Sequence, residues 1–159
     1  MKIEILIKTQ VLDLYLAGQF QRSYRISTAR NGSGQLMNSE CTPLGHHYIR
    51  AKIGDAAASG SVFVGRRWTG ETYHPDLRQR YPQRDWILTR ILWLCGREPG
   101  LNRLGDVDTM RRYVYIHGAP EDDPIGVPGS RGCIKMRNTD IIELFERVSV
   151  GCPVEIRES

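Results

Sequence analysis

The chain has 159 residues, of which 40% are hydrophobic and 25% charged, and its formal net charge is +4. This length predicts one domain over residues 1–159, large enough to bury a core without disulfide bridges. The small, dispersed charge argues against a nucleic-acid partner, and no apolar run approaches the ~20 residues that a membrane span needs. The opening stretch MKIEILIKTQ lacks the apolar segment of an export signal, so the sequence alone predicts a cytoplasmic chain unless such a signal lies elsewhere.

Short strands are predicted through the first third of the chain. Isoleucines alternate with charged residues near the N-terminus (residues 3–7), which is the period of a half-buried strand. Further strands are expected at 11–16, 20–27 and 47–53. The Gly-, Ser- and Asn-rich stretch 29–40 is expected to be a surface loop.

The middle of the chain alternates apolar segments with long loops. The β-branched and apolar segments 61–68 and 85–94 are predicted strands, and the second is expected to be central in its sheet. Between them, 69–84 carries two prolines and is expected to be a loop with room for one helical turn. A second long loop is expected at 96–109, followed by a strand at 111–117.

One segment has clear helical periodicity. Apolar residues recur at helical spacing over about 139–148, with Asn138 as the expected N-cap, and a last strand follows at 153–156. The fold class is therefore mostly β, with one clear helix in the C-terminal half and long loops.

Cys133, in the heptad SRGCIKM, is the first candidate for chemistry. Its neighbours Arg131 and Lys135 would favour the thiolate, and Gly132 leaves room for a substrate carbonyl beside the backbone. The alternative is that Cys133 fills the core, since cysteine is among the most buried residues. The other 3 of the 4 cysteines are scattered without a CxxC pair, so no metal or cofactor is predicted, and burial is expected for them.

His117 is the candidate base for such a nucleophile. It ends the predicted strand 111–117, on one face with Tyr113 and Tyr115, and a turn-rich loop leads from it to Cys133. Gly118 would allow a sharp turn and offer a carbonyl to orient the imidazole. The alternative is a histidine that is hydrogen-bonded at a strand end and has no chemical role.

The turn before Cys133 offers donors for a developing oxyanion. Ser130 can hydrogen-bond nearby backbone, and the consecutive amides of Arg131, Gly132 and Cys133 could form an oxyanion hole.

These motifs together resemble the catalytic segment of the YkuD-type L,D-transpeptidases. The segment YIHG, then a loop ending in P-x-S-x-G-C-I-K-M, then N-x-D and an amphipathic helix, carry the resemblance. The opening strands, the element TPLGHHYI and the segments WILTRILWLCGREPGLNR and VDTMRRYVYIHG extend it over nearly the whole chain.

The resemblance implies a β-sandwich and a cysteine acyl transferase that acts on peptidoglycan stem peptides. Cys133 would attack the L-centre carbonyl of diaminopimelate, release D-alanine and pass the thioester to an amine. His117 would act as the base, oriented by the Gly118 carbonyl, and the Ser130–Cys133 backbone would hold the oxyanion. A periplasmic or cell-envelope location is also implied, without a cofactor.

Two positions depart from the family pattern. Arg131 stands where many members have a second histidine, and arginine cannot act as a base, so it would instead lower the thiol pKa or bind a substrate carboxylate. Lys135 stands where arginine is frequent, which keeps a charge for substrate binding without the bidentate fork.

Two other functions stay open at this point, and a third is disfavoured. Water as acceptor would make the chain an L,D-carboxypeptidase. A wall-binding β module would leave Cys133 inert. The NlpC/P60-like peptidases are disfavoured, because their cysteine precedes their histidine.

Overall fold

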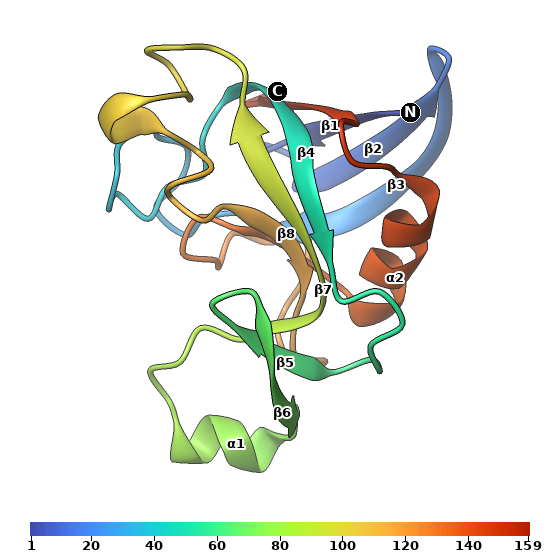
Figure 1. Ribbon diagram of the computed structural model, residues 1–159, viewed down its shortest axis with the longest axis vertical. Coiled ribbons are helices and arrows are strands. Elements are labelled where there is room, and N and C mark those ends of the chain that lie inside the picture. Colours follow the sequence, from blue (N-terminus) through green and yellow to red (C-terminus); the bar gives the residue numbers. More distant parts are fainter.

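The computed structural model describes all 159 residues and is built mostly from strands (Figure 1). The strands are β1 (Lys2–Leu6), β2 (Val11–Leu16), β3 (Gln19–Ser27), β4 (Gly45–Ile53), β5 (Ser61–Val64), β6 (Arg67–Thr72), β7 (Ile87–Gly96), β8 (Tyr115–Gly118), β9 (Ile134–Met136) and β10 (Pro153–Arg157). The helices are α1 (Pro75–Arg80), α2 (Asn138–Arg147) and a short 3-10 turn, η1 (Gly105–Val107). The predicted mostly-β fold with one longer helix is confirmed.

Most of the strands close into a barrel. They follow the order β4-β10-β1-β2-β3-β9-β8-β7, and β7 pairs back with β4. The pairs β1–β10 and β8–β9 are parallel, and the other pairs are antiparallel. The hairpin β5–β6 extends the sheet from β7 and, with α1, projects from one end of the molecule (Figure 1).

The barrel interior is one apolar core of 21 buried residues, drawn from the barrel strands, α2 and the segments flanking them. Alternate residues of each strand point inward, as Ile3 and Ile5 of β1 do, because successive side chains of a strand face opposite sides. Helix α2 buries Ile141, Leu144 and Phe145 in this core. Each such side chain stabilises the fold by about 1.5–3 kcal/mol. Neither α-helix has the length and apolar character needed to cross a bilayer.

The segment 61–68 forms a hairpin, so the prediction of a single strand there is wrong. Gly65 and Arg66 both have left-handed backbone angles, with φ of 56° and 64°. Two consecutive left-handed residues reverse the chain tightly, and this turn type matches the twist of the paired strands. The second strand, β6, and helix α1 then occupy part of the predicted loop 69–84.

The segment 111–117 is only partly extended, which corrects a second expectation. Tyr113 adopts a left-handed φ of 56° at the end of a turn, and β8 begins only at Tyr115. The three residues of β9, which follow Cys133 directly, were not predicted as a strand. Because β8 begins at Tyr115 and β9 follows Cys133, the two strands pair, and this pairing places the candidate site residues side by side.

Candidate active site

The parallel pair β8–β9 frames the candidate site. Ile116 lies opposite Ile134 and His117 opposite Lys135, so Cys133, one residue before β9, lies beside Tyr115. Ile116 and Ile134 belong to the barrel core. Because side chains alternate along a strand, His117 and Cys133 lie together on the outer face of the barrel.

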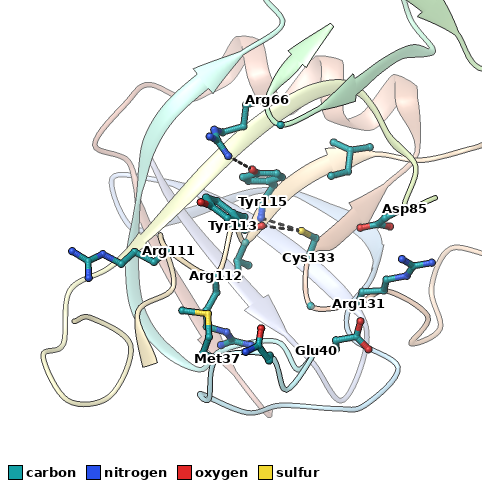
Figure 2. A pocket seen from close by; sticks show the side chains of 15 residues that line it. Met37, Glu40, Arg66, Asp85, Arg111, Arg112, Tyr113, Tyr115, Arg131 and Cys133 are labelled. Atoms are coloured by element: carbon teal, nitrogen blue, oxygen red, sulfur yellow. Dashed lines mark hydrogen bonds between the residues drawn. The ribbon is translucent and has the colours of Figure 1, made fainter. Parts of the chain in front are cut away.

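Cys133 is half-buried, and its sulfur is engaged by backbone on both sides. The Tyr115 N–H donates to Sγ at 3.3 Å, and the thiol donates to the Tyr113 carbonyl at 3.5 Å (Figure 2). Burial raises the pKa of the Cys133 thiol to about 12, and the nearby negative charge of Asp85 acts in the same direction. The Tyr115 N–H and the positive charges of Arg112 and Lys135 lower this pKa, but burial and Asp85 outweigh them.

With its pKa raised in this way, Cys133 is mainly a thiol near pH 7. The flanking charge of Lys135 does lower the pKa, as expected, but burial has the larger effect.

His117 is almost fully buried, at 1% exposure, and is held in one tautomer. Its Nδ1 lies 2.6 Å from the Gly118 carbonyl oxygen. A carbonyl only accepts, so Nδ1 carries the proton and the Nε2 lone pair is free. Burial lowers the pKa of His117, although the Asp85 charge and the Gly118 bond oppose this, so the ring is neutral near pH 7.

Cys133 and His117 are diagonal neighbours on adjacent strands, and no hydrogen bond joins them in this structure. Catalytic hydrogen bonds are often long without substrate and tighten when it binds. The thiol and the imidazole are both neutral, and Nε2 of the imidazole is free to accept a proton. Transfer of the thiol proton to Nε2 would turn the sulfur into a nucleophile and the imidazolium into an acid.

Gly118 is required for space rather than for a turn, which corrects its expected role. It lies within β8, and a Cβ there would collide with Asn138 Oδ1 and come within 2.7 Å of the Leu88 oxygen. Asn138 is the first residue of α2 rather than its N-cap, and its side chain turns inward to donate to the Ala119 oxygen at 2.9 Å. This bond fixes the chain directly after the His117–Gly118 pair.

The turn from Ser130 to Cys133 is locked from within. The Gly132 N–H donates to Ser130 Oγ at 3.1 Å, and that hydroxyl donates to the Cys133 carbonyl. Gly132 has a φ of 125°, and Thr42 Oγ1 donates to its carbonyl at 3.0 Å. The Gly132 amide is thus occupied, whereas the amides of Arg131 and Cys133 donate to no acceptor in the protein. Two of the three expected oxyanion donors remain available.

A cavity of about 610 Å³ opens above Cys133. Arg66, at the tip of the β5–β6 hairpin, forms part of its wall; its guanidinium lies 4.9 Å from the Tyr113 ring centre and donates to Tyr115 Oη at 2.9 Å (Figure 2). Cation–π contact and hydrogen bond together hold the hairpin over the site. The volume lies in the range of small-ligand pockets.

Two charged residues of this cavity were missed by the sequence analysis. Arg112 is half-buried and donates to the Cys41 carbonyl at 2.6 Å and the Gly34 carbonyl at 3.1 Å, which anchors the 33–42 loop beside Gly132. The only sequence signal was an arginine pair beside a tyrosine. Asp85 precedes β7, and its negative charge acts to raise the pKa of both Cys133 and His117. In the sequence it was only the first residue of the predicted strand 85–94, which carries no signal of a site.

The two cations flanking Cys133 have different surroundings. Lys135 forms an ion pair with Asp123 at 3.1 Å, and Asp123 also binds Arg78 at 2.6 Å, so the Lys135 charge is largely compensated. Arg131 is exposed and donates to the Gln83 carbonyl at 3.0 Å. Its guanidinium has no ionic partner and remains available to an anion.

The other three cysteines do not line the cavity above Cys133. Cys95 and Cys152 are buried as expected, at 6% and 7% exposure, whereas Cys41 is half-buried rather than buried. No group of three or more His, Cys, Asp or Glu side chains is arranged to hold a metal ion.

Comparison with known proteins identifies the family. The model of the YkuD family, the L,D-transpeptidase catalytic domain, matches residues 1–156. The chain belongs to this family. A curated relative, the probable L,D-transpeptidase ErfK/SrfK of Salmonella typhimurium, is 47% identical over 45 residues, which are 28% of this chain and 15% of that protein.

Solved structures share the fold. The Ldtfm-avibactam carbamoyl enzyme superimposes with a TM-score of 0.60 at 20% identity, covering 99% of this chain and 49% of that chain. LdtMt1 in complex with imipenem gives a TM-score of 0.58 at 19% identity, covering 98% of this chain and 57% of that one. This chain thus spans about half the length of those proteins.

Proposed function

We propose that this protein is a cysteine acyl transferase acting on the tetrapeptide stems of peptidoglycan. Cys133 would attack the carbonyl at the L-centre of diaminopimelate, expel the terminal D-alanine and hold the acyl group as a thioester for transfer to an amine. The observation that supports this most is the placement of a thiol and a free imidazole nitrogen on one strand pair, beside a cavity of about 610 Å³. Family membership points to the same reaction.

Acylation begins with one proton transfer. As Sγ approaches the substrate carbonyl, His117 Nε2 takes the thiol proton, and the C–S bond forms. The imidazolium then gives this proton to the amine nitrogen of D-alanine as the C–N bond breaks. The Gly118 carbonyl keeps Nδ1 protonated throughout, so the same nitrogen, Nε2, receives and returns the proton.

The free amides of Arg131 and Cys133 are the proposed oxyanion donors. Each such donor is worth about 3–4 kcal/mol of barrier when it points at the developing charge. The bonds between Gly132, Ser130 and Cys133 fix the turn in advance, so no reorganisation is needed during the reaction. A single histidine, His117, suffices for this scheme, because Arg131 contributes its backbone and its positive charge rather than a base.

The substrate class places the proposed activity in the cell envelope, where polymeric peptidoglycan lies.

The test is release of D-alanine from a disaccharide tetrapeptide by two matched variants. Cys133→Ala removes the nucleophile and is expected to lose release below detection, with the melting temperature kept. Cys95→Ala removes a buried thiol that does not line the cavity above Cys133, and it is expected to retain the wild-type rate. Release by the Cys133 variant at the wild-type rate would exclude the proposed function, and so would a wild-type protein without release.

A further inference from the structure

Thr42, the first residue of the element TPLGHHYI, is fully buried beside the turn that carries Cys133. Its backbone is fixed from two sides: its N–H donates to the Gly32 carbonyl at 3.0 Å, and its carbonyl accepts from the Gly34 N–H at 2.9 Å. The side chain does not line the cavity above Cys133. Thr42 is therefore not placed to touch a substrate bound there, and any part it plays in the reaction acts through the turn.

The hydroxyl of Thr42 makes two hydrogen bonds whose directions are fixed. The Ala29 N–H donates to Oγ1 at 2.9 Å, and Oγ1 donates to the Gly132 carbonyl at 3.0 Å. Because an N–H can only donate and a carbonyl can only accept, the single proton of the hydroxyl lies toward Gly132. The hydroxyl thus accepts from one backbone segment and donates to another.

The Gly132 carbonyl and the Cys133 N–H belong to the same peptide group. A trans peptide is planar, so its C=O and N–H point in opposite directions. Anchoring the Gly132 oxygen at Thr42 therefore turns the Cys133 N–H away from Thr42, and no acceptor in the protein takes this N–H. The Cys133 N–H is one of the two proposed oxyanion donors. Its direction is thus set by a hydroxyl on the far side of the peptide.

The hydroxyl of Thr42 is what holds this particular peptide. Ser130 Oγ accepts from the Gly132 N–H and donates to the Cys133 carbonyl, so it fixes the peptide groups before and after, but not the one between them. Gly132 has a φ of 125°, and glycine populates both signs of φ readily. Without the anchor at Thr42, the peptide between Gly132 and Cys133 would meet little resistance to rotation.

The same hydrogen bond strengthens the donor as well as orienting it. Hydrogen bonds that follow one another in a chain polarise one another. Here the chain runs from the Ala29 N–H through the Thr42 hydroxyl to the Gly132 carbonyl, and the Cys133 N–H is its free end. A carbonyl that accepts a hydrogen bond draws electron density from its own peptide N–H, which makes that N–H a better donor to an anion.

We propose that Thr42 is a positioning residue of the acyl transfer, whose hydroxyl orients and polarises the Cys133 N–H toward the oxyanion. This inference rests on the proposed function and adds a residue to it. As Sγ adds to the substrate carbonyl, negative charge develops on the carbonyl oxygen, and a donor fixed in advance stabilises it without reorganisation. Loss of the hydroxyl should therefore slow acylation while the thiol keeps its own reactivity.

The test compares two reactions of Cys133 in Thr42→Val, which keeps the shape of threonine and removes the hydroxyl. Acylation by a disaccharide tetrapeptide, followed as D-alanine release per folded molecule, passes through an oxyanion. Alkylation by iodoacetamide displaces iodide at a saturated carbon and forms no oxyanion. Thr42→Val should lower kcat for release by about tenfold to a hundredfold, short of the loss of a whole donor, with little change in KM. Alkylation, located at Cys133 by peptide mapping, should keep the wild-type rate.

Two further variants serve as controls. Thr42→Ser retains a hydroxyl and should recover most of the release. Thr109→Val makes the same substitution at another fully buried threonine, whose hydroxyl lies 2.9 Å from His47 Nε2 rather than at the turn, and it should leave both reactions unchanged. If Thr42→Val does not fold, Thr42→Cys carries the same comparison, because a thiol is only a weak donor. Release should again fall while alkylation of Cys133 is kept.

Four outcomes would overturn the inference. They are wild-type release by the folded variant that lacks the hydroxyl, equal losses of release and alkylation in that variant, a serine variant as slow as it, and an equal loss of release in Thr109→Val. In each case the wild-type protein still releases D-alanine, so the proposed function stands. Absence of release by the wild-type protein would refute both.

Discussion

Successive residues of the strand pair β8–β9 point to opposite faces, and these two faces differ completely in chemistry. On the inner face, Ile116 and Ile134 are fully buried in the barrel core. On the outer face, His117 is buried and Cys133 is half-buried, and both keep polar partners from the backbone. One face supplies stability, and the other supplies groups whose pKa values are shifted by the same burial.

This difference shows how the fold prepares a reaction. The rigid core fixes the register of β8 and β9, and the register fixes where the thiol and the imidazole lie. Burial on the outer face then keeps both groups neutral, since a charge on either is disfavoured away from water. Substitutions on the two faces should consequently have separable effects.

The largest effect on stability is expected from the inner face. Ile134→Ala leaves a cavity in the barrel core and should lower the free energy of unfolding by about 2–5 kcal/mol. D-alanine release per folded molecule, measured well below the melting temperature, should stay within a few-fold of wild type. Chemical denaturation followed by fluorescence gives the first quantity. If Ile134→Ala left the free energy of unfolding unchanged, packing of Ile134 in the core could not be what holds β8 and β9 in register.

His117 tests the outer face. His117→Gln should slow D-alanine release by at least ~10²-fold, because the thiol loses its proton acceptor. The melting temperature should fall by a few degrees, because His117 is almost fully buried, so the rate is taken per folded molecule. A variant that unfolds while the acylation rate of its folded fraction stays normal would assign His117 a purely structural role.

The pH dependence of Cys133 alkylation tests the raised pKa. With the pKa of the thiol near 12, the rate with iodoacetamide should keep rising above pH 9. At pH 7 it should be about a hundredfold below that of the same cysteine in the unfolded chain, after allowance for the greater nucleophilicity of a more basic thiolate. Peptide mapping separates Cys133 from the other three thiols. A plateau reached by pH 7 would mean that the free protein holds a thiolate.

Much of the barrel was predictable from sequence because strand periodicity is a local signal. The isoleucines of β1 and the helical pattern of α2 were identified correctly. The β5–β6 hairpin was not, because the left-handed angle of Arg66 is uncommon for a residue with a side chain.

The candidate site was predictable in its residues but not in its electrostatics. Motif spacing pointed to His117 and Cys133, and the structure places them on one face. The raised pKa of the thiol depends on how many atoms surround the sulfur, and Asp85 reaches the site from a distant loop. The residues flanking Cys133 in the sequence reveal neither the burial of its sulfur nor the proximity of Asp85.

The smallest effect on stability and activity is expected from Cys152, which lies outside the strand pair β8–β9. Cys152, in the turn before β10, is 7% exposed, and its thiol lies 3.4 Å from the Met1 carbonyl. Cys152→Ala should cost about 1 kcal/mol of stability, the typical effect of a single substitution, and leave D-alanine release unchanged. A loss of release at constant stability would indicate that the site extends across the barrel.

Intact mass after incubation with imipenem tests the central claim most directly, since a β-lactam can acylate an activated thiol and the added mass is measured directly. The wild-type protein should gain one adduct per chain, peptide mapping should locate it on Cys133, and His117→Gln should form the same adduct at least ~10²-fold more slowly. An adduct on Cys41, or one formed by Cys133→Ala at the wild-type rate, would contradict the assignment of Cys133 as the nucleophile.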